Sequence, residues 1–162
     1  MERKRSRRRR LLFVVFALCM AVLMAVEAPV QAAASPTCSS LYDEVKKKCS
    51  AGAKKVSKKS SCTFLGYSYR KKVTDFYYAT DSDQVYCVCI VKADSKSNAK
   101  KIKKQFDEIK KSNQKNKYLS SSEKKVVKAA QVGYSGCYVW YVSLSSGSST
   151  NKKAVKALKK KL

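Results

Sequence analysis

The chain has 162 residues, of which 36 are Lys or Arg and 11 are Asp or Glu, so its formal net charge is +25. This length suits one domain with a modest core. The chain contains no histidine, which excludes the common Ser–His and Cys–His nucleophile pairs and most zinc sites. It also lacks a glycine-rich phosphate loop. We therefore predict that the protein is not an enzyme, has no catalytic residues and needs no cofactor or metal.

Residues 1–34 have the plan of a secretory signal peptide. Seven of residues 2–10 are Lys or Arg, and sixteen apolar residues follow at 11–26. The alternative is an uncleaved membrane anchor. Sixteen helical residues span about 24 Å, less than the ~30 Å hydrocarbon core, which favours the cleaved signal. We predict a secreted or extracytoplasmic protein, or an N-terminally anchored one if the signal is not cleaved.

Small side chains mark the expected cleavage site. Signal peptidase requires them at the residue before the cut and two residues earlier, and Ala32 and Ala34 meet both requirements. We therefore expect the mature chain to begin at Ser35, with Ala33 as the second choice.

The rest of the chain is predicted to hold an N-terminal helix and basic linker (35–61) and an α+β domain (62–162). Hydrophobic periodicity, turn residues and caps define the expected elements. In chain order these are a helix at 39–49, strands at 73–79 and 85–92, helices from 94 to about 112 and from 120 to 130, strands at 131–134 and 137–144, and a helix at 152–162.

Three local patterns carry most of this prediction. Residues 85–92 are apolar on both faces, as in a central strand. Ser120 and Glu123 have the spacing of a capping box. Asp81 and Asp83 fall in a turn, where Asp is favoured for its geometry rather than as a calcium ligand. The order α-β-β-α-α-β-β-α predicts a two-layer α+β domain, in which an antiparallel sheet of about four strands packs under helices.

One hydrophobic core is expected between the two apolar strands and the helix after them. Ala99, Ile102, Phe106 and Ile109 form one stripe on that helix. In the last helix, Val155, Leu158 and Leu162 are expected to face inward. The residues predicted for the common core are Cys87, Val88, Cys89, Ile90, Ile102, Phe106, Val139 and Trp140.

Four features of the chain occur together in a known family. They are the strand Asp75-Phe-Tyr-Tyr, the strand from Gln84 to Ala93 that leads into a helix, Tyr118 before the capped short helix, and the arm Gly136-Cys-Tyr-Val. In this order they resemble the bacterial domain of unknown function 4358, found in exported proteins and lipoproteins of Gram-positive bacteria, over about Tyr67 to Leu144. The resemblance implies an exported location and a fold, but no activity. The family usually has an acidic or mixed surface and often a lipidated cysteine, and this chain departs on both counts.

Six cysteines follow the signal segment, an even number that allows three disulfides in an exported chain. The alternative is that they are reduced, buried thiols. Cys87 and Cys89 lie on one strand face and should not bond each other, whereas Cys137 is expected on a strand that neighbours theirs. A cysteine metal site is a weaker option, since no CxxC pair is present. The six are Cys38, Cys49, Cys62, Cys87, Cys89 and Cys137.

Lysine dominates the charge after the signal. From Ser35 onward, 29 basic residues stand against 9 acidic ones, a formal +20, and Arg70 is the single arginine. Lysine is a flexible point charge without the planar fork that reads bases and phosphates, so it favours diffuse attraction to polyanions over sequence-specific nucleic-acid recognition. A solvated surface with no cognate partner is the competing interpretation. The expected contacts are Lys96, Lys100, Lys103, Lys104, Lys111, Lys152, Lys156 and Lys160.

Together these features predict an exported, non-enzymatic binding module that associates with anionic cell-wall polymer or a membrane surface. Two alternatives stay open: a secreted cysteine-dependent redox protein, and an N-terminally anchored scaffold domain. The sequence leaves the oligomeric state open.

Overall fold

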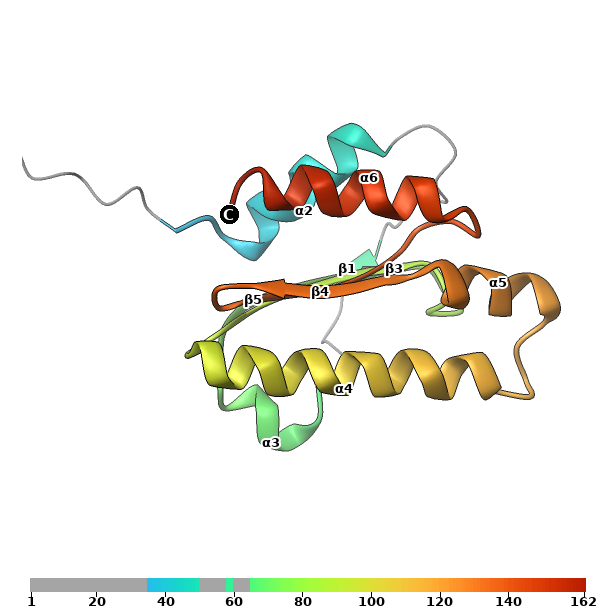
Figure 1. Ribbon diagram of the computed structural model, residues 1–162, viewed down its shortest axis with the longest axis horizontal. Coiled ribbons are helices and arrows are strands. Elements are labelled where there is room, and N and C mark those ends of the chain that lie inside the picture. The colour runs from blue at the N-terminus through green and yellow to red at the C-terminus, as the bar shows by residue number, and fades with distance from the viewer. Residues whose placement is uncertain (1–34, 50–57, 60–64) are drawn as a thin grey trace, which may run out of the picture. The chain divides into compact units, whose positions relative to one another are not determined.

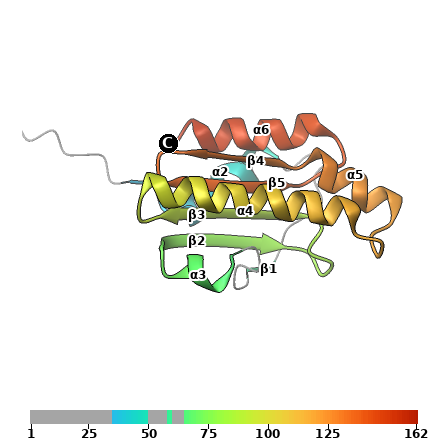
Figure 2. The same cartoon turned by 60° about the horizontal axis from the view of Figure 1, so that its bottom comes forward.

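Five antiparallel strands form one sheet in the part of the chain that the computed structural model describes, residues 35–49, 58–59 and 65–162. The strand order is β1-β2-β3-β5-β4, and Figure 2 shows the four longer strands side by side. The strands are β1 (Lys58–Lys59), β2 (Val73–Thr80), β3 (Cys87–Ala93), β4 (Gln131–Ser135) and β5 (Tyr138–Ser143). The predicted signal segment and Cys62 lie outside the described residues.

Helices cover both faces of this sheet (Figure 1). The described helices are α2 (Cys38–Lys48), α3 (Tyr67–Arg70), α4 (Lys96–Lys115), α5 (Ser121–Ala129) and α6 (Ser148–Lys159). α2 and α6 lie on one face and α4 on the other, while α5 lies at one end of the sheet. The predicted α+β class, antiparallel sheet and element order are confirmed, with β1 and α3 as short additions. The domain has three layers, however, where the sequence predicted two.

The third layer follows from the central strands. All six residues of β5 are buried, as are all but one in β3, so each strand has apolar side chains on both faces. Successive strand residues point to opposite faces. A sheet with two apolar faces must be covered on both, and α2 covers the face opposite to α4. Ser35–Leu162 accordingly form one compact unit that includes α2.

The predicted single core is therefore two cores, separated by the sheet. Val88, Ile90 and Trp140 pack toward α2 and α6. Cys87, Cys89, Ile102, Phe106 and Val139 pack on the α4 side. The prediction that all eight residues are buried is confirmed, but their assignment to one cluster was wrong because neighbouring strand residues alternate between faces.

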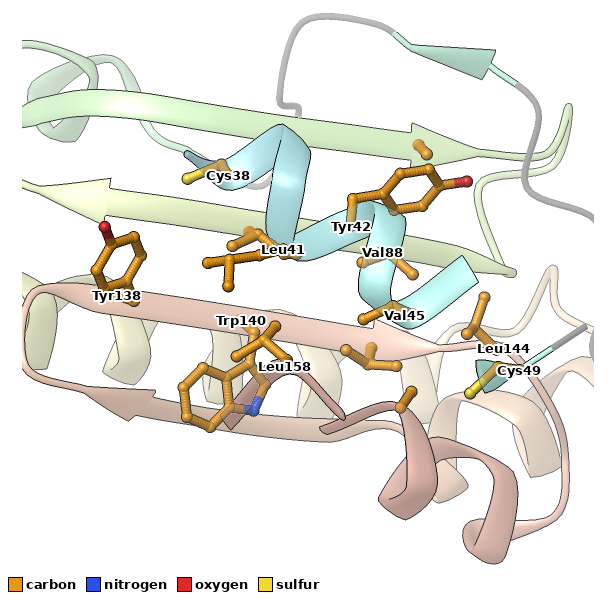
Figure 3. Packing of buried hydrophobic residues seen from close by; sticks show 14 residues of the cluster. Cys38, Leu41, Tyr42, Val45, Cys49, Val88, Tyr138, Trp140, Leu144 and Leu158 are labelled. Atoms are coloured by element: carbon orange, nitrogen blue, oxygen red, sulfur yellow. The ribbon is translucent and has the colours of Figure 1, made fainter. Parts of the chain in front are cut away.

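Aliphatic side chains from α2 and α6 meet on the first face. Figure 3 shows Leu41 and Val45 of α2 and Leu158 of α6 directed toward the strands that carry Val88 and Trp140. Two hydrogen bonds fix the start of α2 on the sheet. Asp75 Oδ2 accepts from the Cys38 backbone N–H at 2.7 Å, and Tyr138 Oη donates to the Pro36 carbonyl at 2.6 Å.

On the second face, Phe106 is fully buried and its ring meets Tyr141 edge-on, with centroids 6.2 Å apart. Side chains cap the starts of α4 and α5, and the predicted capping box of α5 is confirmed. The Ser95 side chain accepts from the Asn98 backbone N–H at the start of α4. Ser120 and Glu123 form the capping box of α5. α4 extends to Lys115, three residues beyond its predicted end.

α6 begins at Ser148, four residues earlier than predicted. The reason is Asn151, whose fully buried side chain accepts from the Leu144 backbone N–H and donates to the carbonyls of Ala129 and Ser145. Ala154 and Leu158 continue this buried face. Val155 is only partly buried and Leu162 is 40 % exposed, so two of the three residues expected to face inward do not belong to the buried stripe.

Within residues 35–49, 58–59 and 65–162, no helix combines the length and the apolar composition that crossing a membrane requires.

Candidate anion-binding surface

The solvent-facing side of α6 and the end of α2 hold a cluster of lysines. α6 packs on the sheet through Asn151, Ala154 and Leu158, so the residues between them point outward. α2 ends beside α6 with three consecutive lysines in its last turn, Lys46–Lys48. We call six of these side chains the α6 lysine surface: Lys48, Lys152, Lys153, Lys156, Lys159 and Lys160.

Two shallow hollows lie along this surface. The larger, about 350 Å³, lies between α6 and the edge strand β4. Its lining residues are Gln131, Lys152, Val155, Lys156, Lys159 and Lys160. The smaller, about 200 Å³, lies between α6 and the end of α2. Its lining residues are Lys48, Lys153, Lys156, Ala157 and Lys160. Because Lys156 and Lys160 line both, the hollows adjoin.

None of the described residues that line the two hollows is acidic. The sequence from 145 to 162 contains no Asp or Glu at all. Lys47–Glu44 and Lys103–Asp107 are ion pairs of the described residues, and neither involves a lysine of α6. Six ammonium groups without counter-charges create a local positive potential, which attracts any anionic group that approaches.

One lysine of the larger hollow contacts a tightly packed aromatic ring. Lys159 Nζ lies 5.5 Å from the centre of the Trp140 ring, a cation–π distance. Trp140 is 2 % exposed and packs against Gly133 on the neighbouring strand β4. An added Cβ at Gly133 would lie 2.6 Å from the indole, so the indole and β4 are in close contact. Lys159 therefore lies over a well-packed ring.

The structure brings together only part of the predicted lysine set. Lys152, Lys156 and Lys160 lie one turn apart and all line the larger hollow. The other five are on α4, across the sheet from α6 (Figure 1): Lys96, Lys100, Lys103, Lys104 and Lys111.

Two α4 lysines also have internal partners. Lys103 is paired with Asp107 at 2.5 Å. Lys110, which the sequence did not select, donates to the Ala130 carbonyl, and burial lowers its pKa. The sequence missed Lys153 and Lys159, although both are in the same lysine-rich helix. Lys48 and Gln131 also line the hollows, because tertiary contacts bring α2 and β4 beside α6, and no local sequence pattern predicts such contacts.

None of the five described cysteines forms a disulfide bond with another described residue. Cys87 and Cys89 are fully buried on the α4 side, on one face as predicted, and Cys38 and Cys49 are buried on the other. Cys137 lies in the β4–β5 turn, where its carbonyl accepts from Ala93 N–H. The strand that follows Cys137, β5, pairs with β3 as predicted, but Cys87 faces Ser143 and Cys89 faces Tyr141, so Cys137 itself lies opposite neither cysteine.

The thiols of α2 are held in their protonated form. Burial raises the pKa of Cys38 well above its usual range, and the nearby Asp75 carboxylate adds to this effect. Burial also raises the pKa of Cys49, and Lys153 only partly opposes the shift. The thiolate is the nucleophile and the metal ligand, so these two residues are poorly suited to either chemistry. Among the described residues, no three Cys, Asp or Glu side chains gather as a metal-binding group.

The chain matches no family model, no curated protein and no solved structure.

Proposed function

We propose that this protein is an exported, non-enzymatic binding module of the cell envelope, and that the α6 lysine surface holds anionic polymer through many weak contacts. One observation carries the proposal: six lysines line two adjoining hollows that contain no acid. A polymer that neutralises several of them releases its condensed counterions, which favours binding without a shaped pocket. The export part rests on the signal-like N-terminus and on the resemblance to the domain of unknown function 4358.

The chemistry of the surface favours charge density over ligand identity. Lysine ammonium groups on flexible stems adapt to phosphate, sulfate or carboxylate alike, whereas bidentate recognition would need arginine. Anionic wall polymer is the expected partner outside a bacterial cell, and an acidic membrane surface presents the same chemistry. Binding should be weak, sensitive to salt and indifferent to sequence.

The redox alternative receives less support from the thiols. Four of the five described cysteines are buried, and the pKa values of Cys38 and Cys49 are raised, whereas reactive cysteines are exposed and have lowered pKa values. The anchored-scaffold alternative depends on residues 1–34. N-terminal sequencing of exported protein decides it: a chain beginning at Ser35 or Ala33 supports cleavage, and an intact Met1 in the membrane fraction supports an anchor.

Two triple variants test where the polymer binds. Lys152, Lys156 and Lys160 are replaced by Gln on α6, and Lys96, Lys100 and Lys104 are replaced by Gln on α4. Both sets have the same spacing and remove three charges. Binding to teichoic acid, heparin and DNA is measured over a range of salt concentrations. We expect the α6 variant to lose affinity. The slope of log affinity against log salt concentration should become shallower by about two to three, because each lost contact removes about 0.7–0.9 from its magnitude.

The α4 variant is the matched control and should change the slope by less than one. Equal weakening by both variants would show that the net charge attracts the polymer and that the α6 surface has no special role. Tight binding of one polymer that persists at high salt would contradict the diffuse mechanism.

A further inference from the structure

A third hollow, of about 350 Å³, lies at the end of the sheet where the β2–β3 turn, the last turn of α4 and α5 come together (Figure 1). This volume is at the lower end of the range for small-molecule sites, about 300–1,000 Å³. Polar residues at its rim are Asp83, Gln84, Asn113 and Asn116, and its apolar base includes Ile109 and Tyr141. We propose that this hollow binds one neutral saccharide unit.

The lining argues against a charged ligand. Eight of the twenty residues of α4 are lysine, yet none of them lines this hollow. Among the described residues that line it, Asp83 alone carries a charge, so an anion meets a repulsive carboxylate there and no cationic partner. A cation would have to approach against the positive field of the whole domain. A neutral ligand avoids both penalties.

The polar groups suit hydroxyls. Ile109 and Asn113 are four residues apart on one face of α4, and Asn116 caps the C-terminal end of this helix, so both amides border the hollow. An amide group both donates and accepts hydrogen bonds, as a sugar hydroxyl does. Asn116 Oδ1 accepts from the Tyr118 N–H at 3.0 Å, while the Asn113 amide forms no side-chain hydrogen bond with the described residues. The apolar base below can receive the C–H face of a sugar ring.

Two further features lie beside the hollow, a strained backbone residue and an exposed aromatic ring. Gln84 has a φ of 57°, which makes it the one non-glycine residue with positive φ in the described part of the chain. Such conformations cost about 1–3 kcal/mol and concentrate at binding and catalytic sites. Tyr118, between the lining residues Asn116 and Leu119, is 84 % exposed. Lys117 Nζ lies 5.3 Å from the centre of this ring, and the rest of the exposed ring is a further surface on which a longer glycan can rest.

The experiment titrates the purified, ¹⁵N-labelled protein with two uncharged sugars, chitotriose and maltotriose, and follows amide chemical shifts. We expect at least one sugar to give saturable shifts at Asn113, Asn116 and the turn that carries Gln84. Asn113→Ala should weaken this binding about tenfold, the loss expected for one hydrogen-bonding group. Gln114→Ala is the matched control, because Gln114 is the next residue of α4 and does not line the hollow.

Equal melting temperatures for the two variants establish that any difference arises at the site. The proposal is overturned if neither sugar produces saturable shifts, or if Asn113→Ala and Gln114→Ala bind equally. It is also overturned if inorganic phosphate binds the same residues more tightly than either sugar. The α6 lysine surface lies across the sheet from α4, so failure here leaves the polyanion proposal untouched.

Discussion

Replacing Gly133 by Ala tests the contact that supports the α6 lysine surface. The added Cβ would lie 2.6–2.9 Å from three atoms of the Trp140 indole, whereas carbon atoms in contact prefer about 3.5–4.0 Å. The indole is 2 % exposed and packed in the α2–α6 core, so it cannot move aside freely. Overpacking of this kind destabilises the folded state by about 1–3 kcal/mol. Alanine also makes the unfolded chain less flexible than glycine does, which stabilises the protein by about 0.4–1 kcal/mol. We therefore expect a net loss of about 1–2 kcal/mol.

Urea unfolding followed by far-ultraviolet circular dichroism measures this loss, which corresponds to a melting temperature lowered by roughly 4–8 °C. Trp140 is the only tryptophan of the chain, so its fluorescence reports the displaced ring directly. The control repeats the substitution in a Trp140→Phe background, where the smaller ring leaves room and Gly133→Ala should cost less than in the native protein. An equal cost in both backgrounds, or no loss in the native one, would refute the reasoning.

Three further substitutions or reactions test other parts of the fold. Phe106→Ala should cost about 3–5 kcal/mol, because it empties a fully buried site against Tyr141, and an unmoved urea midpoint would show that α4 does not cover the sheet. Asn151→Ala should cost about 2–4 kcal/mol by leaving the Leu144 N–H and two carbonyls without their partner, whereas Asn98→Ala on the exposed start of α4 should cost less than half of that. Alkylation of the native protein with iodoacetamide, mapped by peptide mass spectrometry, should label Cys137 well before Cys38, Cys87 and Cys89; early labelling of any of these three would contradict their burial.

The strands and caps could be predicted because they depend on local chemistry. A run apolar on both faces, such as Cys87–Ala93, can be satisfied only in the middle of a covered sheet. The capping box of Ser120 and Glu123 satisfies backbone groups within one turn, so its spacing alone identifies the start of α5. In both cases the interaction that stabilises the element lies within the segment that encodes it.

The number of layers could not be obtained in the same way. The stripe of Leu41 and Val45 shows that α2 is amphipathic, but not which surface it covers. Its placement depends on Asp75, which is 37 residues away in sequence, and on the Tyr138 hydroxyl, which binds Pro36 across 102 residues. Neither partner carries a local signal for this role, because a strand aspartate and a strand tyrosine are each compatible with ordinary solvent exposure.

The α6 lysine surface shows how one buried polar group decides the geometry of a site. Apolar periodicity alone favours a helix at 152–162 that buries Val155, Leu158 and Leu162. Asn151 instead anchors the helix to the backbone at Leu144, Ser145 and Ala129, and the buried face becomes Asn151, Ala154 and Leu158. With that face fixed, Lys152, Lys156, Lys159 and Lys160 line the hollow beside β4, and Lys153 lies on the side of α2. The lysines were visible in the sequence, but the direction in which they point is set by an asparagine whose hydrogen bonds exist only in the folded domain.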